Sequence, residues 1–231
     1  SQAGEDRVAI CARCGYAANV ELAVSRAPAP TFPAWALEEV ATPDAKTIAE
    51  VCAFLGIEPA LTIKALVVMT DSGPALALVR GDHQLHERKL QRVVGAFRPA
   101  RREEIVEATG GEAGFVGPVG LALRTIADET LRTGCYVTGA NKPDTHLRGV
   151  VPGTHFRAEF ADLREAAPGD ACAMCGAALA VVLIMVYLGG ALGANTFLMY
   201  GFFNAVPMEI DEAAKIDGAT HAQTYWTIIL P

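Results

Sequence analysis

Apolar positions in the first third of the chain follow a helical period first and a strand period afterwards. Thr47-Ile-Ala-Glu50 has the form of a capping box, and apolar residues follow at helical spacing as far as Leu55. This pattern predicts a helix that ends at Gly56. The next apolar runs, 62–69 and 75–79, are separated by a turn that contains Gly and Pro, which predicts a hairpin of two strands.

Further short elements follow the hairpin without a regular repeat. Two polar helices are predicted, one after His83 with Leu90 on its apolar side and one over 101–109. Strands mixed with short helices, without βαβ repetition, predict an α+β (mixed α/β) domain. The other strand-like runs are 38–42, 119–126, 135–138, 146–151 and 155–160.

The composition changes about three quarters of the way along the chain. Residues 1–177 carry 18 Lys and Arg against 22 Asp and Glu, whereas no charged residue stands between Asp170 and Glu209. Within that gap, Leu179–Leu198 is an uncharged run of 20 residues, the length that a helix needs to cross a bilayer. We therefore expect two parts, a water-soluble domain over 1–177 and an α-helical membrane-type segment over 178–231.

The charge balance limits the partners of the chain. The formal net charge of −7 excludes a bulk electrostatic footprint for nucleic acid. Any contact with RNA must be local, and Arg98, Arg101 and Arg102 are the candidates. The chain begins without Met or a signal peptide and stops inside an apolar run, so we expect neither end to be a natural terminus.

The six cysteines include two Cys-x-x-Cys pairs, Cys11/Cys14 and Cys172/Cys175, each followed by glycine. Two pairs of this form predict a structural zinc ion with four thiolate ligands, which would tie together the two ends of the folded domain. Two unmetallated thiol pairs are the alternative. The other cysteines are predicted to be buried apolar residues, namely Cys52 and Cys135.

Lys64 interrupts the first apolar strand of the predicted hairpin. On a strand it shares a face with Leu66 and Val68, so its ammonium either reaches the strand end or lies in a pocket with a partner. The pattern alone leaves both alternatives open.

Six short motifs stand in order along the first 177 residues. They are Cys11-Ala-Arg-Cys-Gly-Tyr-Ala-Ala-Asn-Val-Glu21, Glu39-Val-Ala-Thr-Pro43, Thr62-Ile-Lys-Ala-Leu66, Val79-Arg-Gly-Asp-His83, Gly114-Phe-Val-Gly-Pro-Val-Gly120 and Gly139-Ala-Asn141. Over residues 7–177 the chain thereby resembles the editing insertion domain of bacterial-type prolyl-tRNA synthetase, a member of the YbaK-like deacylase family.

The resemblance implies hydrolytic editing, in the cytoplasm and without a cofactor, of alanine mischarged onto tRNA(Pro). The family's pocket admits alanine beside the terminal adenosine and excludes the larger proline. Its lysine, which helps to hold the terminal nucleotide, falls on Lys64, and its histidine falls on His146. Its loop falls on Gly114, Gly117 and Pro118. The residues implied for substrate binding are Thr62, Gly139, Ala140 and Asn141.

The residue types suit the hydrolysis of an ester by water. A glycine-rich loop exposes backbone N–H groups that stabilise an oxyanion, and His146 or a substrate hydroxyl can orient the water. No Ser-His-Asp or Cys-His set is evident, so direct hydrolysis without a covalent intermediate is predicted. Three alternatives stay open: Gly114–Gly120 as a simple turn, His146 as a polar residue at a strand edge, and His83 with His86 as a metal pair.

Three positions depart from the family pattern. His86 stands where asparagine is usual, Leu147 replaces an aromatic residue, and Pro143 lies in the loop before His146. The last two departures bear on the placement of His146.

The end of the chain carries a second resemblance. Glu212-Ala-Ala-Lys-Ile-Asp-Gly218, followed after nine residues by Ile228-Ile-Leu-Pro231, resembles the cytoplasmic coupling loop of ABC sugar importer permeases of the maltose type. The resemblance implies an inner-membrane segment that docks on an ATPase subunit. A generic amphipathic helix is the alternative. The implied coupling residues are Glu212, Ala213, Ala214, Asp217 and Gly218.

Two classes of function therefore compete. One is an editing hydrolase that acts on the acceptor end of tRNA(Pro) carrying alanine, and the other is a membrane transport subunit. The transport part is incomplete, because a single span cannot form a translocation path. The class II motifs of the synthetase core are absent as well, so aminoacylation is not expected. Two unrelated gene fragments joined at about 177–180 are the simplest interpretation.

Overall fold

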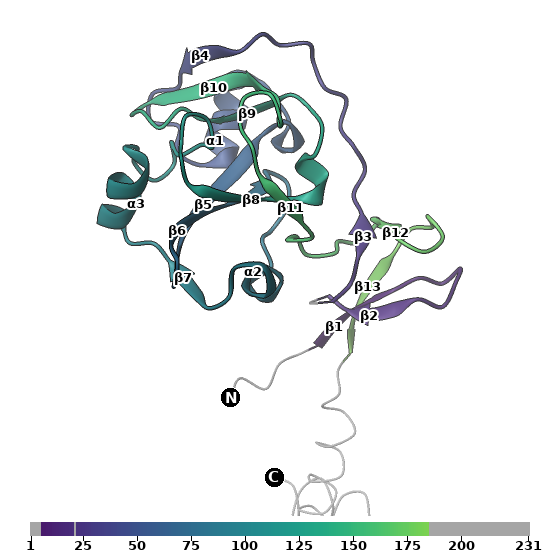
Figure 1. Cartoon of the computed structure of the whole chain (residues 1–231). Helices are drawn as coiled ribbons and strands as arrows, with labels where there is room; N and C mark the ends of the chain where they lie inside the picture. Colours follow the sequence, from purple (N-terminus) through teal and green to yellow (C-terminus); the bar gives the residue numbers. More distant parts are fainter. Residues whose placement is uncertain (1–5, 21, 185–231) are drawn as a thin grey trace, which may run out of the picture. The chain divides into compact units, whose positions relative to one another are not determined.

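The hairpin predicted from the apolar runs is the centre of the fold. The computed structural model describes residues 6–20 and 22–184 (Figure 1). β5 (Ile63–Thr70) pairs antiparallel with β6 (Gly73–Arg80) along its whole length. Both belong to a five-stranded sheet of order β11–β8–β6–β5–β7, in which β8 is parallel to β6 and β11 is parallel to β8. The remaining members are β7 (Phe97–Pro99), β8 (Arg124–Asp128) and β11 (Glu159–Ala161).

Both faces of the five-stranded sheet carry core residues. Ile63 and Val67 belong to one buried cluster together with Leu76, whereas Val68 belongs to a second cluster together with Leu90. Because side chains alternate across a strand, a strand that is covered on both faces must be apolar at successive positions. Each fully buried Val, Leu or Ile contributes about 1.5–3 kcal/mol to folding by leaving water.

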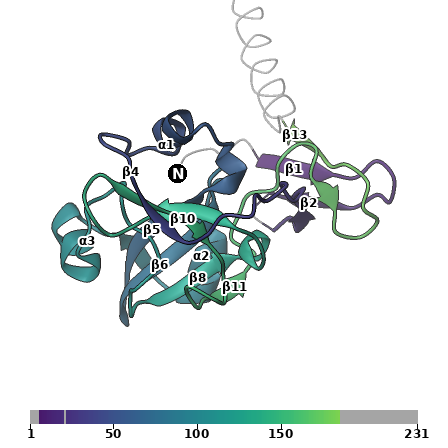
Figure 2. The same ribbon diagram turned by 90° about the horizontal axis from the view of Figure 1, so that it is seen from above.

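A three-stranded antiparallel sheet packs beside the first one (Figure 2). Its order is β4 (Glu38–Ala41), β10 (Thr145–Val150), β9 (Tyr136–Gly139), so β10 is the central strand. Tyr136 and Val150 join the cluster of Ile63, and a bridge links Thr62 to Val137. The end of β5 that carries Lys64 therefore lies close to β9.

All three predicted helices are present, as α1 (Ile48–Leu55), α2 (Glu87–Val94) and α3 (Arg102–Thr109). The capping box of α1 is confirmed by reciprocal hydrogen bonds between Thr47 and Glu50, and Gly56 caps its end in the left-handed conformation. His86 is the N-cap residue of α2, and its side chain makes no capping hydrogen bond. Short 3₁₀ turns complete the helical elements at η1 (Pro59–Leu61) and η2 (Glu129–Leu131).

Two predicted strands are shorter than the sequence pattern indicated. The run 119–126 becomes a strand only at Arg124, because Asn141 holds the carbonyl of Val119 and Gly120 adopts a φ of +78°. The run 155–160 becomes a strand only at Glu159, because His155 caps a turn through the N–H of Val151.

Two small sheets bring the ends of residues 7–182 together (Figure 1). One has the order β13–β1–β2 and the other pairs β3 with β12. The sequence pattern did not predict these strands. Their bounds are β1 (Asp6–Ile10), β2 (Ala17–Asn19), β3 (Ser25–Arg26), β12 (Ala171–Cys172) and β13 (Ala180–Ile184).

β13 corrects the expected membrane helix over Leu179–Leu198. Its residues Ala180–Ile184 form a strand rather than the first turns of a helix, since β1 supplies backbone partners there. In the part of the chain that the structure describes, no helix is long and apolar enough to cross a membrane. Residues 185–231, which hold the rest of the expected span and the coupling loop, lie outside the described residues.

Buried ion pairs attach the small sheets to the rest of the domain. Arg164 donates to Asp170 over 2.6 Å and to the carbonyl of Ser25 over 3.0 Å. Lys89, on α2, donates to Asp162 over 2.8 Å and to the carbonyl of Ala23 over 2.8 Å. Each buried cation therefore has both a counter-charge and backbone acceptors, as burial of a charge requires.

Candidate active site and cysteine cluster

A pocket of about 670 Å³ opens where the start of β5, the start of α1 and the end of β9 meet. Its wall is mixed, with aliphatic side chains beside a few polar and charged groups, as small-molecule sites are. The polar and charged residues that line it are Lys46, Thr47, Thr62, Lys64, Asp82, Gln84, Thr138 and His146, and Gly114 and Gly139 also line it.

Lys64 reaches this pocket from the first strand of the hairpin. Its Nζ donates to the carbonyl of His83 over 3.2 Å and lies 3.5 Å from Oε1 of Gln84. Burial lowers the pKa of the Lys64 ammonium, and the charge of Asp82 partly opposes that shift. The structure thus selects the second alternative for Lys64, a pocket with partners.

A buried guanidinium fixes the acidic side of the pocket. Arg80 is 3% exposed and holds Asp82 with two hydrogen bonds, of 2.6 Å from Nε and 2.8 Å from Nη2. Nη2 also lies 3.0 Å from Nε2 of His83, and since a guanidinium only donates, that nitrogen accepts. Burial lowers the pKa of His83 to about 4, so the ring is neutral at physiological pH.

His146 sits on the central strand of the three-stranded sheet and is 5% exposed. Its Nδ1 lies 2.6 Å from Oγ1 of Thr42, and the ring meets Phe115 edge-on at 5.5 Å. Burial lowers its pKa, while a hydrogen bond with the backbone of Gly114 opposes the shift. The expectation of a polar strand-edge residue is therefore wrong for His146, because β4 and β9 flank it on both sides.

The glycine-rich loop is held by Asn141. Asn141 Oδ1 accepts from the N–H of Gly117 over 2.9 Å, and Nδ2 donates to the carbonyls of Gly117 and Val119, each over 3.1 Å. The backbone N–H of Asn141 donates to the carbonyl of Phe115 over 2.8 Å. The two motifs, Gly114–Gly120 and Gly139–Asn141, therefore form one hydrogen-bonded unit.

Close backbone contact explains two glycines of this unit. A Cβ on Gly117 would lie 2.0 Å from the carbonyl oxygen of Gly139, and a Cβ on Gly139 would lie 2.2 Å from the carbonyl of Phe115. Neither position tolerates a side chain unless the loop moves away from β9.

The predicted site residues divide into two groups. Lys64, His146, Gly114, Thr62 and Gly139 line the pocket, as expected of a shared site. The other predicted residues are not among the described residues that line the pocket, and they belong to the two motifs that support it. They are Gly117, Pro118, Ala140 and Asn141. Asn141 and Gly117 satisfy one another, so the N–H of Gly117 is not available to an oxyanion.

The geometry also argues against the alternative of a metal pair at His83 and His86. Nε2 of His83 faces the Arg80 guanidinium, and the one cluster with metal-ligand geometry among the described residues does not include His83 or His86. Arg98 is bound by both oxygens of Glu104 in an exposed ion pair, and the local RNA contact at Arg98, Arg101 and Arg102 stays a prediction.

Sequence reasoning missed several pocket residues. Asp82 lies within the Val79-Arg-Gly-Asp-His83 motif and Gln84 follows it directly, but their approach to Lys64 depends on the pairing of β5 with β6. Lys46 precedes the capping box of α1, and nothing in the local pattern connects it with Gly114. Thr138 is 1% exposed, and its Oγ1 has no hydrogen-bond partner within the described residues.

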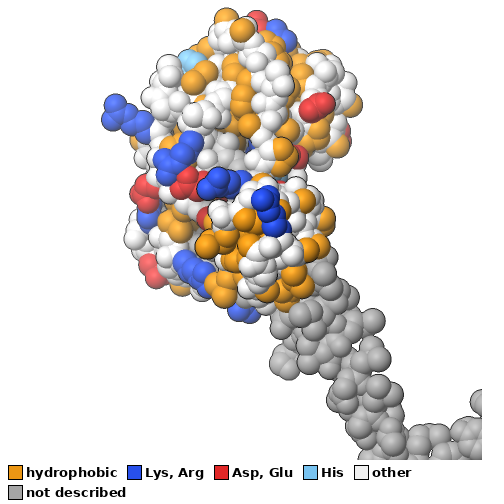
Figure 3. Space-filling model, turned by 90° about the vertical axis from the view of Figure 1, so that its right-hand side faces the viewer, with side chains coloured by type: hydrophobic (Ala, Val, Ile, Leu, Met, Phe, Trp, Pro, Cys, Tyr) orange, Lys and Arg blue, Asp and Glu red, His pale blue; other side chains and the backbone are white. Residues whose placement is uncertain are grey.

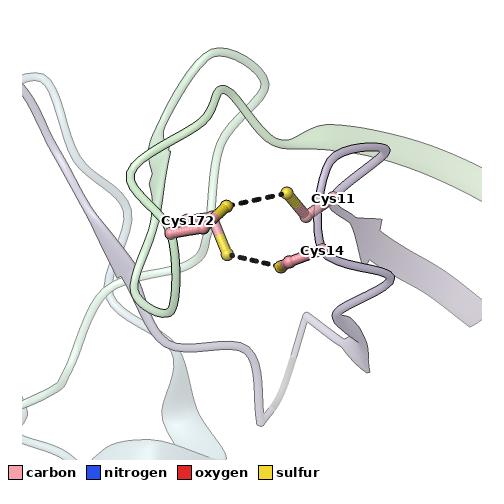
Figure 4. A group of neighbouring side chains, drawn as sticks. Cys11, Cys14 and Cys172 are labelled. Atoms are coloured by element: carbon pink, nitrogen blue, oxygen red, sulfur yellow. Dashed lines mark hydrogen bonds between the residues drawn. The ribbon is translucent and has the colours of Figure 1, made fainter.

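The four knuckle cysteines converge as predicted, although their pairs are far apart in sequence (Figure 4). Their sulfur atoms lie within 4.8 Å of one another, with Cys11 at 3.5 Å from Cys175 and Cys14 at 3.7 Å from Cys172. Thiolates at the corners of a zinc tetrahedron lie about 3.8 Å apart, given a Zn–S bond of about 2.3 Å. The arrangement therefore fits a four-thiolate metal site.

The two knuckles share one backbone form. Gly15 donates to the carbonyl of Cys11 over 3.0 Å and Gly176 donates to that of Cys172 over 2.9 Å, and the two glycines have φ values of +73° and +74°. A hydrogen bond from the backbone N–H of Cys14 lowers the pKa of the Cys11 thiol to about 6, whereas desolvation and the neighbouring thiols raise the pKa of Cys14 to about 12. Backbone N–H groups that favour a thiolate are a property of cysteines that bind metals.

The fold and the pocket define the class of protein. Residues 42–155, which include the whole pocket from Lys46 to His146, match the profile of the aminoacyl-tRNA editing domain. A crystal structure described as a candidate trans-editing enzyme for prolyl tRNA synthetase is 30% identical with a TM-score of 0.50, over 56% of this chain and 87% of that one. The chain belongs to the aminoacyl-tRNA editing domain family.

Curated relatives match a longer part of the chain than the editing-domain profile does. The proline–tRNA ligase of Thermodesulfovibrio yellowstonii is 43% identical over 183 residues, which is 78% of this chain and 32% of that protein. The proline–tRNA ligase of Geotalea daltonii is 43% identical over 181 residues, with 76% and 32% covered. The chain thus spans about a third of the length of these relatives.

A second profile matches the end of the chain. Residues 176–231 match the inner membrane component of binding-protein-dependent transport systems. Of these residues the structure describes only 176–184.

Proposed function

We propose that residues 1–177 form an editing domain that hydrolyses alanyl-tRNA(Pro) in the cytoplasm. The observation that carries the proposal is the convergence of Lys64, His146 and the Asn141-held loop on one pocket. The similarity to proline–tRNA ligases over this region supports the choice of substrate. Aminoacylation is not part of the proposal.

In the proposed reaction, water attacks the carbonyl carbon of the alanyl ester. The bond between that carbon and the ribose oxygen breaks, and the proton of water passes to the ribose oxygen, which releases alanine and tRNA. No nucleophilic side chain is used. The backbone N–H groups assigned to the developing oxyanion are those of Gly114 and Val116, because both residues line the pocket while Gly117 is bound to Asn141.

Lys64 and His146 have different roles in this proposal. The Lys64 ammonium, held by His83 and Gln84 at the pocket wall, binds the terminal nucleotide of the tRNA. His146 has its Nδ1 bound to Thr42 and contacts the backbone of Gly114, so it positions the loop and limits the space for the amino acid. A methyl side chain fits this space, whereas the proline ring is excluded by steric clash.

Substitution of Lys64 tests the assignment. In the full chain, Lys64→Ala is expected to lower kcat/KM for alanyl-tRNA(Pro) on the order of a hundredfold, because the ester loses its alignment with the loop. Unchanged turnover would remove Lys64 from the site. Thermal melting of the same variant checks that the fold is retained.

The cysteine cluster supports a second, structural proposal. Cys11, Cys14, Cys172 and Cys175 are assigned to one zinc ion that joins the two ends of the domain. Their thiolate set and near-tetrahedral spacing suit zinc better than harder metal ions. The ion would contribute to folding and would take no part in hydrolysis.

A different function is proposed for the end of the chain on the basis of its profile match. Residues 178–231 are assigned to a fragment of an ABC importer permease, with Glu212, Ala213, Ala214, Asp217 and Gly218 as the contact to an ATPase subunit. Binding of this chain to such a subunit, measured with and without Gly218→Trp, tests the assignment. Equal binding by both would contradict it.

A further inference from the structure

Lys46 occupies a distinctive position at the pocket. It directly precedes the Thr47 cap of α1, is exposed, and lines the pocket. Its Nζ lies over the ring of Phe115, 5.9 Å from the ring centroid, and Phe115 in turn meets His146 at 5.5 Å. The ammonium of Lys46 therefore lies over Phe115, whose ring contacts His146 in the pocket.

The backbone of Lys46 is held firmly although its side chain is exposed. Its N–H donates to Oε2 of Glu50 over 3.0 Å as part of the cap of α1. A Cβ on Gly114 would lie 2.8 Å from Cβ of Lys46, so Lys46 rests directly against the glycine-rich loop. The loop and the stem of Lys46 are thereby fixed relative to one another.

Apart from the ring of Phe115, the ammonium of Lys46 has no hydrogen-bond or ion-pair partner within the described residues, unlike those of the other lysines there. Lys64 donates to His83, Lys89 binds Asp162, and Lys142 binds Glu39. No ion pair within 4.0 Å joins Glu50 to the Lys46 ammonium, because the Glu50 carboxylate accepts from the backbone N–H groups of Thr47 and Lys46. These hydrogen bonds, and to a smaller extent the charge of Lys46, lower the pKa of Glu50.

The proposed substrate needs a cation at such a place. An RNA end carries a phosphodiester next to its terminal nucleoside, and this chain is acidic overall. On the face shown in Figure 3, Lys and Arg side chains are scattered among apolar and acidic ones rather than gathered into one basic surface. On this face, phosphate therefore meets single cations rather than one basic surface (Figure 3).

We propose that Lys46 forms a subsite for the phosphate on the 5′ side of the terminal nucleoside. The proposal rests on the proposed editing function and deepens it, because it divides the work between two lysines. Lys64 acts inside the pocket, where its donors already have protein acceptors, and Lys46 binds the phosphate at the rim.

Two substrates that differ in phosphate test this subsite in the full chain. One is a minihelix of the tRNA(Pro) acceptor stem charged with alanine, and the other is 2′(3′)-O-alanyladenosine, which has no phosphate. Lys46→Ala is expected to lower kcat/KM about tenfold or more for the minihelix, through KM, and to leave alanyladenosine within about twofold. Lys46→Arg is expected to restore most of the loss, and Lys142→Ala, at an exposed paired lysine, is the matched control.

Salt dependence supplies a second readout. The slope of log(kcat/KM) against log[salt] for the minihelix is expected to fall by about 0.7–0.9 in Lys46→Ala, as for the loss of one phosphate contact. An equal loss on both substrates, or no loss on the minihelix, would overturn the subsite.

Binding without catalysis separates this proposal from the proposed function. Adenosine 5′-monophosphate is expected to bind the full chain more tightly than adenosine, and Lys46→Ala is expected to bind both equally. That preference supports the subsite even if neither ester is hydrolysed, in which case only the editing assignment fails. Equal binding of adenosine and adenosine 5′-monophosphate by the unaltered chain would overturn the subsite.

Discussion

Asn141 shows how a single residue can hold a site that it does not line. Its side chain binds the N–H and carbonyl of Gly117 and the carbonyl of Val119, and its φ of 58° lies in the left-handed region that asparagine tolerates. The sequence motif placed Asn141 among the substrate-binding residues. The structure gives its amide a different use, which is to connect the loop to the end of β9.

Removal of the Asn141 side chain is expected to destabilise the loop. Asn141→Gly keeps the backbone conformation but leaves up to three backbone groups without their partner, so the free energy of unfolding should fall by about 1–3 kcal/mol. Chemical denaturation measures this change. The neighbouring Lys142→Ala, which removes an exposed ion pair with Glu39, is expected to cost at most about 1 kcal/mol. If Asn141→Gly were as stable as the unaltered chain, the proposed role of Asn141 in holding the loop would be contradicted.

Residue types alone predicted part of the site. Lys64 was identifiable because one charge stood in an apolar strand, but the strand alternation did not decide between the strand end and a pocket. Lys46 and Asp82 were not identifiable as pocket residues, because each reaches the pocket through contacts that depend on pairing between distant segments. Thr138 belongs to the same class, since its missing partner is visible only once β9 has been placed.

Among the elements, α2 lacks a side-chain hydrogen bond at its N-cap. His86 occupies its N-cap position, where the related family has asparagine, and makes no side-chain capping bond, while its buried Nδ1 has no partner within the described residues. An N-cap asparagine accepts a hydrogen bond from the first turn. This departure from the family pattern therefore weakens the helix that carries Lys89.

Replacement of this cap is expected to stabilise the protein. His86→Asn should raise the free energy of unfolding by about 1 kcal/mol, which for a chain of this size corresponds to roughly 2–4 °C in Tm. Calorimetry of the full chain measures the shift. His86→Ala, which has no capping group, is the control and should give no gain. An unchanged or lower Tm in His86→Asn would contradict this account of the helix start.

Local pattern predicted elements well where a cap or a turn was encoded nearby. α1 has both its capping box and its glycine stop, and the hairpin of β5 and β6 has its turn. The small strands β1 and β13 were missed because neither has a strong alternation of its own. β1 and β13 pair because two distant segments of the chain meet beside the cysteine cluster. A short stretch of sequence carries no information about such a meeting.

For the molecule as a whole, the cysteine cluster is the feature that closes the domain. Purified full chain is expected to carry one zinc ion, measured by mass spectrometry of metals, because four cysteine sulfurs already lie at near-tetrahedral spacing. Cys172→Ser should lose the ion and lower Tm, since binding to a preformed site contributes to folding. Cys52→Ala, outside the cluster, should retain it.

The zinc account has a clear contrary result. A chain that retains its Tm in the presence of a strong chelator, and that takes up no zinc after treatment with a reductant, would show that the cysteines are unmetallated thiol pairs. In that event the buried pairs of Arg164 and Lys89 would be the main attachment between the small sheets and the domain.

The central claim is that the pocket hydrolyses the alanyl ester of tRNA(Pro) and rejects the prolyl ester. The most direct test is single-turnover hydrolysis of both charged tRNAs by the full chain, with Lys64→Ala measured alongside. The account predicts that alanyl-tRNA(Pro) is cleaved on the order of a hundredfold faster than prolyl-tRNA(Pro), and that Lys64→Ala abolishes the difference by losing the alanyl activity. Equal rates for the two esters, or full alanyl activity in Lys64→Ala, would contradict it.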